Sequence, residues 1–262
     1  MLLQKMNLTK HLPTDSYPFS LPWLANLQSL SFDKPVTMIV GENGSGKSSL
    51  MEAIAIQAQA IVLAGETFVN NPEYQAISKL SDTMQLSWSR KSSRGFFFRA
   101  DDFISFILAT QQRKQDAQEA LNEIKDPQSL ARIPYLHTLY DLSRLYPTDL
   151  GQISHGEAFL ALFKSRLRDH SLYFLDEPET PLTPQHQLAL LYVIHEAVLK
   201  DSQFIIVTHS PILMAYPQAD ILELSETGIR HVAYDQIEHV QFMKHFLDSP
   251  ERYLSKLFSD DQ

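Results

Sequence analysis

The sequence predicts an α/β fold in which a mixed, mainly parallel β-sheet is flanked by helices. Three strand-sized runs, Val36–Val40, Leu172–Leu175 and Phe204–Val207, are almost continuously apolar. Such runs are typical of parallel strands that are buried on both faces, and helical patterns separate them along the chain. The first run leads into a glycine-rich loop, Gly41–Gly46, which is followed by another helical pattern.

The composition is that of an ordinary globular protein. Hydrophobic residues make up 44% of the 262 residues and charged residues 20%, which argues against an intrinsically disordered chain. The length suits one large domain or two small ones. The chain has no cysteine, so disulfides, thiolate zinc sites, iron–sulfur clusters and cysteine nucleophiles are all excluded.

The formal net charge of −9 gives no general attraction for nucleic acid. A small basic cluster, Arg90, Lys91 and Arg94, is most simply a solvated hairpin turn between strands at Met84–Trp88 and Gly95–Phe98. No apolar run approaches the roughly 18 residues of a membrane span. Residues 1–15 also lack the apolar core of a signal peptide. We therefore expect a cytoplasmic protein without membrane insertion.

The remaining elements follow from turn signals and from helical spacing of apolar residues. Further strands are predicted at Ser29–Phe32 and in a final hairpin, Ile221–Leu224 with Ile229–Tyr234. Helices are predicted from about Ser48, over Phe103–Asp126, over Gly156–Arg168, and from Pro184 with Thr183 as the N-cap. Phe103–Asp126 and Ile237–Leu257 either carry partner contacts or form a helical subdomain that packs on a core of its own.

The glycine-rich loop is a predicted phosphate site. Gly41-Glu42-Asn43-Gly44-Ser45-Gly46-Lys47-Ser48 matches the pattern G-x-x-x-x-G-K-[ST], and Ser49 follows it. The glycines let several backbone N–H groups converge on one anion, and the following helix directs its positive N-terminus to the same point. The lysine is placed to reach the β- and γ-phosphates, and the hydroxyl of Ser48 can ligate Mg²⁺.

Two acids, Asp176 and Glu177, end the buried strand Leu172–Leu175. The carboxyl ends of parallel strands meet at one edge of a sheet, so both carboxylates should face the phosphate loop. Two adjacent carboxylates are costly unless a cation shares the site. We expect Asp176 to hold Mg²⁺ and Glu177 to act as the general base on the attacking water.

Two further segments allow a structural and a functional interpretation. Ser154 with Glu157 has the spacing of a capping box, and the same helix N-terminus, with Gly156, could bind a γ-phosphate. His209 follows the buried strand Phe204–Val207, where it is either a structural histidine or a hydrogen-bond donor to the phosphate or water.

Together these motifs resemble those of ABC-type ATPases. Gly41–Ser48 resembles the Walker A motif, Ile153–Glu157 the signature motif, Leu172–Glu177 the Walker B motif with its catalytic glutamate, Glu179–Leu182 the D-loop, and His209 the switch histidine. More narrowly, the chain resembles small stand-alone AAA_21-like ATPases, relatives of the heads of structural-maintenance-of-chromosomes (SMC) and DNA-repair ATPases. This implies one ABC-type ATPase domain over residues 1–262, with an antiparallel amino-terminal β region and a helical subdomain inserted at roughly 103–170.

The resemblance also implies a ligand and a partner. The ligand is ATP with Mg²⁺. The partner is a second copy, bound head to tail only with ATP, whose signature residues cap the nucleotide: Ser154, His155, Gly156 and Glu157. The signature here reads Ser-His-Gly-Glu, which resembles the non-transporter branch.

Some positions depart from the family pattern. No glutamine follows a strand where a Q-loop is expected, and Asp101 is the candidate in its place and a candidate metal ligand. Tyr17 and Phe19 are candidates for stacking on adenine. About 100 residues separate the Walker A and signature motifs, which is too few for a long coiled-coil arm.

Three functions remain open. The first is a non-transport ATPase whose ATP-driven dimer switches an unknown protein partner or nucleic acid, as in DNA maintenance or phage defence. The second is the ATP-binding subunit of a membrane transporter, against which His155 and the missing Q-loop glutamine argue. The third is a small-molecule P-loop kinase, which would not explain Ser154–Glu157 or His209.

Overall fold

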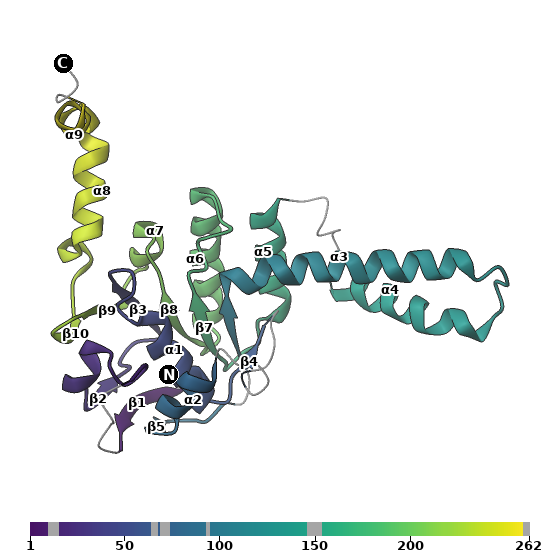
Figure 1. The fold of residues 1–262 in the computed structure, drawn as a ribbon, viewed down its shortest axis with the longest axis horizontal. Coiled ribbons are helices and arrows are strands. Elements are labelled where there is room, and N and C mark those ends of the chain that lie inside the picture. The colour runs from purple at the N-terminus through teal and green to yellow at the C-terminus, as the bar shows by residue number, and fades with distance from the viewer. Residues whose placement is uncertain (10–15, 64–67, 69–73, 93–94, 146–153, 259–262) are drawn as a thin grey trace.

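The computed structural model describes residues 1–262 except 10–15, 64–67, 69–73, 93–94, 146–153 and 259–262. Two β-sheets and the helices around them form a body from which a long helical hairpin and a shorter C-terminal arm project (Figure 1). The described helices include none that is both long and apolar enough to cross a membrane.

The larger sheet is mixed and has the strand order β10-β9-β3-β8-β7-β6-β4. Neighbouring strands are parallel except for the antiparallel pair of β9 and β10. The strands are β3 (Val36–Gly41), β4 (Ile61–Val62), β6 (Phe96–Arg99), β7 (Leu172–Asp176), β8 (Gln203–Val207), β9 (Asp220–Ser225) and β10 (Gly228–His231). The predicted mixed, mainly parallel sheet is confirmed.

The smaller sheet is antiparallel and consists of β2 (Ser29–Ser31), β1 (Leu3–Leu8) and β5 (Met84–Trp88). A buried side chain joins it to the larger sheet. Gln203 of β8 accepts hydrogen bonds from the backbone N–H groups of Leu2 (2.9 Å) and Leu3 (2.8 Å), and donates one to the carbonyl of Leu3 (3.0 Å).

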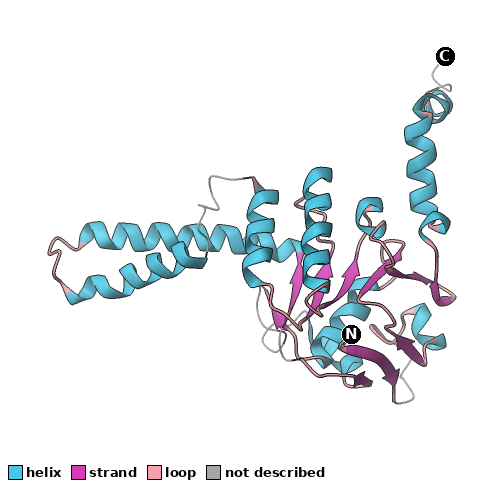
Figure 2. Ribbon diagram, turned by 180° about the vertical axis from the view of Figure 1, so that it is seen from behind, coloured by secondary structure: helices cyan, strands magenta, loops and turns pink. Residues whose placement is uncertain are grey.

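The larger sheet is buried on both faces, which explains its continuous apolar strands. Phe96, Phe98 and Tyr173 point to the face that α5 (His155–Arg166) and α6 (Pro184–Val198) cover. The residues between them along the strands, such as Phe97 and Phe174, pack with α1 (Lys47–Gln57) and the smaller sheet. Figure 2 shows α5 and α6 side by side against the sheet.

The helical hairpin consists of α3 (Ala100–Glu123) and α4 (Ile133–Leu145), with a 3₁₀ turn at Leu130–Arg132 between them. Figures 1 and 2 show it extending away from the body. Apolar side chains such as Leu108, Leu136 and Tyr140 are exposed on it. The two helices contact each other, and the start of α3 joins the main core through Phe103 and Ile107.

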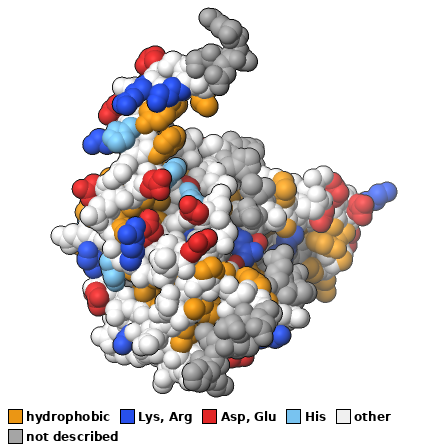
Figure 3. All heavy atoms as spheres, turned by 60° about the vertical axis from the view of Figure 1, so that its left-hand side comes forward, with side chains coloured by type: hydrophobic (Ala, Val, Ile, Leu, Met, Phe, Trp, Pro, Cys, Tyr) orange, Lys and Arg blue, Asp and Glu red, His pale blue; other side chains and the backbone are white. Residues whose placement is uncertain are grey.

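The C-terminal arm consists of α8 (Glu238–Asp248) and α9 (Pro250–Leu257). Only the first turn of α8 joins the core, through Ile237 and Val240. Beyond it, Phe242, Phe246 and Tyr253 pack against one another, and Figure 3 shows hydrophobic side chains on the surface of this projection. The remaining described helices are α2 (Gln75–Ser81) and α7 (Pro211–Met214).

The expected hairpin around the basic turn is wrong. β5 pairs with β1 in the smaller sheet, whereas β6 pairs with β4 and β7 in the larger one. All three phenylalanines of β6 are buried, so this strand needs cover on both faces, which a two-stranded solvated hairpin cannot supply. Arg94 of the basic cluster lies outside the described residues.

The link between the sheets gives a first testable prediction. Gln203→Ala leaves two buried donors and one buried acceptor without partners, so we expect the free energy of unfolding to fall by about 2–4 kcal/mol. Urea denaturation measures this loss. The matched control is Gln85→Ala at an exposed position of strand β5, which should change stability by less than about 0.5 kcal/mol. Equal effects of the two variants would contradict a structural role for Gln203.

Candidate nucleotide site

The phosphate loop connects β3 to α1 in a left-handed turn. Gly44 and Gly46 have φ angles of 77° and 86°, which L side chains rarely adopt. A Cβ on Gly46 would lie 2.7 Å from a methyl group of Leu21, and the indole of Trp23 donates a 2.7 Å hydrogen bond to the carbonyl of Ser45. The loop is thus fixed from outside by the segment that precedes β2.

Lys47 folds back over this loop. Its ammonium group donates to the carbonyls of Gly41 (3.0 Å) and Glu42 (2.7 Å), and the side chain is almost fully buried. Burial lowers the pKa of Lys47, and the charges of Glu177 and Asp176 oppose that shift. The ammonium is therefore held at the mouth of the loop by two carbonyl oxygens, which phosphate oxygens can replace as charge-assisted acceptors.

An open cavity of about 720 Å³ lies over the loop. It brings together the phosphate loop, Glu177 and His209, three segments that are far apart in the sequence. Its lining residues are Tyr17, Leu21, Asn43, Gly44, Gly46, Lys47, Ser48, Ser49, Glu177 and His209. Tyr17 is 54% exposed and its hydroxyl lies 2.9 Å from that of Ser49, whereas Phe19 packs on the core.

Asp176 lies beneath this cavity. It is 4% exposed, and its Oδ1 accepts a 3.1 Å hydrogen bond from the Ser48 hydroxyl. Burial raises the pKa of Asp176 to about 7, and Glu52 adds to the shift while Ser48 and Arg99 oppose it. An acid of this kind binds its proton tightly unless a cation compensates the charge.

Glu177 and His209 face each other across the ends of β7 and β8. His209 Nε2 lies 3.8 Å from Glu177 Oε1. Burial and the charge of Lys47 lower the pKa of His209, against the opposite effect of Glu177, and so favour the neutral imidazole. Glu177 has a positive φ of 48°, a conformation that costs free energy.

The carboxylate of Glu179 fixes the position of His209. The sequence resemblance assigned Glu179 to the D-loop and predicted no contact with the histidine. Glu179 Oε1 accepts hydrogen bonds from the Thr208 hydroxyl (2.8 Å) and from the backbone N–H groups of His209 (2.6 Å) and Ser210 (3.1 Å). Burial raises the pKa of Glu179. Three donors on one oxygen tie the D-loop segment to the histidine turn.

The capping box predicted at Ser154 is present. Ser154 Oγ accepts from the N–H of Glu157 (3.3 Å), and Glu157 Oε2 accepts from the N–H of Ser154 (3.0 Å). Gly156 is buried, and a Cβ there would meet the ring of His186 at 2.2 Å. The side chain of His155 and residue Ile153 lie outside the described part of the structure. Ser154 does not line the cavity of its own chain.

Asp101 lies in the first turn of α3, but its side chain is outside the described part of the structure. The position at the end of β6 that faces the site is Arg99, which pairs in register with Asp176. Arg99 forms an ion pair with Glu52 of α1. Sequence reasoning missed both residues, although the spacing of Ser48 and Glu52, four residues apart, places them on one face of a helix.

The donors present suit a magnesium ion bound together with phosphates. Ser48 and Asp176 already lie within hydrogen-bond distance of each other, and the buried hydroxyl of Ser45 has no hydrogen-bond partner among the described residues. The described residues contain no cluster of three or more His, Asp or Glu that could hold a metal alone. Mg²⁺ usually takes one or two carboxylates and completes its shell with phosphate and water.

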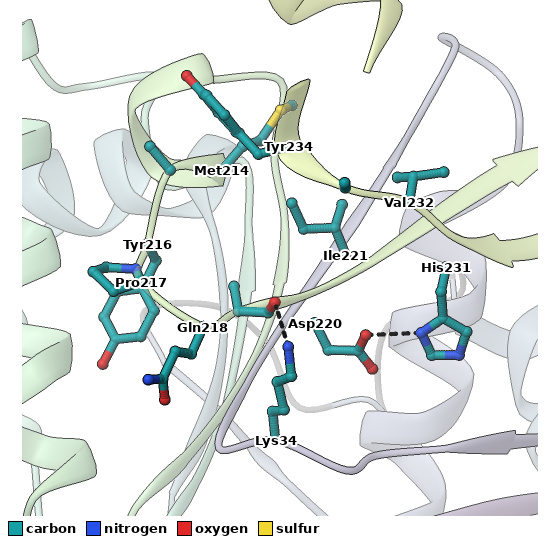
Figure 4. A pocket seen from close by; sticks show the side chains of 13 residues that line it. Lys34, Met214, Tyr216, Pro217, Gln218, Asp220, Ile221, His231, Val232 and Tyr234 are labelled. Carbon is teal, nitrogen blue, oxygen red and sulfur yellow. Dashed lines mark hydrogen bonds and ion pairs between the residues drawn. The ribbon is translucent and has the colours of Figure 1, made fainter. Parts of the chain in front are cut away.

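A second cavity, of about 750 Å³, lies at the opposite edge of the sheet. Figure 4 shows Lys34 bonded to the backbone of Ala219, and His231 bonded to Asp220 at the start of β9. This cavity lies at the amino-terminal end of β9, whereas the phosphate loop follows the carboxyl end of the parallel strand β3. The cavity is therefore remote from the phosphate loop. None of the predicted site residues lines this cavity.

The fold and the site are similar to those of P-loop ATPase domains of the ABC type. The AAA domain family matches residues 19–58. The DNA repair protein RAD50 of Drosophila melanogaster is 26% identical over 37% of this chain and 9% of its own length. The hemin import ATP-binding protein HmuV of Pseudomonas aeruginosa is 26% identical over 74% of this chain and 73% of its own.

Two solved structures are similar in fold. The SMC head domain from Thermotoga maritima covers 88% of this chain and 98% of its own, with a TM-score of 0.45 and 18% identity. An ATP-binding cassette of an ABC transporter covers 94% and 97%, with a TM-score of 0.44 and 17% identity. The predicted resemblance to ABC-type and DNA-repair ATPases is confirmed by the sequence matches.

Asp176 gives a pH-dependent prediction. Its pKa is about 7 in the folded protein against an ordinary 3.8, so the folded state binds this proton more tightly than the unfolded chain does. Stability of the metal-free protein should therefore fall as the pH rises from about 4 to 7. Asp176→Asn should be more stable than the parent chain at pH 8 in EDTA, by on the order of 1–3 kcal/mol.

Urea denaturation at pH 5 and pH 8 measures this difference. At pH 5 the advantage should be small, because the parent carboxyl is then mostly protonated. Glu52, Arg99 and Glu177, which face Asp176, are unchanged in the variant. The exposed change Asp82→Asn controls for net charge. A variant that is less stable at pH 8 would show that burial of this carboxylate is not costly.

Proposed function

We propose that this chain hydrolyses ATP with Mg²⁺ and works as an ATP-gated head-to-tail dimer, a switch for a protein partner. The observation that carries the proposal is the single cavity that brings Lys47, Ser48, Glu177 and His209 together. A phosphate-binding lysine, a magnesium-binding serine and a carboxylate placed to act as a base are what phosphoryl transfer to water requires.

The side chains have distinct tasks in this proposal. Lys47 exchanges its carbonyl contacts for the β- and γ-phosphates of ATP. Glu177 accepts the proton of the attacking water, and the neutral His209 donates a hydrogen bond to the γ-phosphate. Mg²⁺, held by Ser48 and Asp176, would neutralise charge on the phosphates. Glu179 keeps His209 in place through the backbone of its turn.

The second subunit supplies the other half of the site. Ser154 does not line the cavity of its own chain, and the N-terminus of α5 has backbone N–H groups that can donate to an anion. A γ-phosphate bound to a second copy is an anion of this kind. In this proposal the capping box holds the helix end in shape until the dimer forms. Helices α3–α5 then act as the helical subdomain that carries the signature residues.

One observation favours an alternative. The hemin import ATP-binding protein aligns with most of this chain, so a transporter subunit is the second candidate. Affinity purification that brings down membrane permease subunits would support it, whereas a partner without membrane spans would support the switch.

The catalytic base is tested by Glu177→Gln. We expect the hydrolysis rate to fall by about 10²–10⁴-fold, because the amide cannot accept the proton, while ATP binding is retained. Phosphate release and fluorescent-ATP titration measure the two properties. The variant should also become a dimer in light scattering only when ATP and Mg²⁺ are present. ATP binding without any gain in mass would contradict the dimer.

Mixing two inactive variants tests the composite site. Lys47→Ala removes the phosphate contact, and Ser154→Arg blocks the face that caps the partner's nucleotide. Each homodimer should be inactive, but a mixed dimer contains one site with both wild-type halves. We expect the mixture to recover roughly a quarter of the wild-type rate, since half the dimers are mixed and each has one intact site. No recovery, or activity of Ser154→Arg alone, would contradict a site shared between subunits.

A further inference from the structure

We propose that the guanidinium of Arg99, by pairing with the buried carboxylate of Glu52, keeps that carboxylate from binding the metal. Mg²⁺ then binds only together with the nucleotide phosphates. This inference rests on the proposed Mg²⁺–ATP site and assigns a positioning role to two residues outside its motifs.

Glu52 lies where a second metal ligand would lie. It is four residues after Ser48 on α1, so the two side chains leave the same face of the helix. It is 6% exposed, and its charge acts on Asp176, whose pKa it raises. Two buried carboxylates and a hydroxyl thus meet at one point, and such a set attracts a divalent cation without nucleotide.

Arg99 forms an ion pair with the carboxylate of Glu52. It ends β6 directly beside Asp176, with which it pairs in register. The guanidinium also lies 5.1 Å from the ring centre of the buried Tyr74. An arginine held between a carboxylate and an aromatic face is fixed in position and keeps its charge at any ordinary pH.

The charges explain the expected dependence on nucleotide. With Arg99 paired to Glu52, Asp176 is the carboxylate left to a metal, and Mg²⁺ prefers to complete its shell with phosphate oxygens. Without Arg99, the two carboxylates would share the site and would need a cation of their own. Without Glu52, the guanidinium would lose its ion-pair partner and would repel a metal at Asp176 more strongly.

The single variants should therefore change cation binding in opposite directions. For Arg99→Gln at pH 8, we expect Mn²⁺ alone, measured by electron paramagnetic resonance, to bind at least about tenfold more tightly than to wild type. For Glu52→Gln, the gain in fluorescent-ATP affinity that Mg²⁺ gives over EDTA should fall at least about tenfold. ATP affinity in EDTA should stay within about threefold for Glu52→Gln, because the phosphate loop is unchanged.

Two further variants separate charge from a merely structural contact. Glu52→Gln combined with Arg99→Gln removes both charges, and should return both readouts to within about threefold of wild type. Arg99→Lys keeps the cation and should also stay close to wild type. Circular dichroism verifies that each variant is folded, and the isosteric Glu52→Gln tests the proposal if Arg99→Gln does not fold.

If the Arg99–Glu52 ion pair only holds α1 against β6, the variants would change metal binding in a different way. Both single variants and the double variant would then weaken metal binding in the same direction, and that result would overturn the proposal. Wild-type protein that binds ATP equally well with Mg²⁺ and with EDTA would instead overturn the proposed Mg²⁺–ATP site. Opposite shifts in the single variants, with recovery in the double variant, support the role given to Arg99.

Discussion

The hydrogen bond from Ser48 to Asp176 is the interaction on which the rest of the site depends. It joins the first turn of α1 to the end of β7, across 128 residues of sequence. Asp176 can be buried there because the strands on either side of β7 run parallel to it and end at the same edge. The free-energy cost of that burial is visible in its raised pKa, and it is the cost expected of a site prepared for a cation.

The same edge collects the other charged groups and the starts of the projecting helices. Arg99 precedes α3, the longer helix of the hairpin, and bonds to the helix that begins at the phosphate loop. Glu179 holds the turn that carries His209, and the charge of His239, near the start of α8, also acts on that histidine.

The residue patterns predicted those strands that are buried on both faces. The strands β3, β7 and β8 are buried on both faces, so their apolar runs are continuous and readable. β1 was missed because only its Leu3 and Met6 are buried, and its other residues are polar or partly exposed. The error at β5 and β6 has another cause. Two strands that are neighbours in sequence joined different sheets, and sequence spacing does not show which partner a strand chooses.

The sequence by itself determined the phosphate loop, the acid pair and the histidine, because their backbone and charge requirements are local: glycines at positive φ, a helix N-terminus, carboxylates at a strand end. Only the tertiary structure decided that Arg99 lies beside Asp176 and pairs with Glu52. It also decided that Glu179 holds His209. These roles depend on which strand ends lie side by side and which charges are buried together. Such pairings connect residues 30 to 47 positions apart, and no local pattern encodes them.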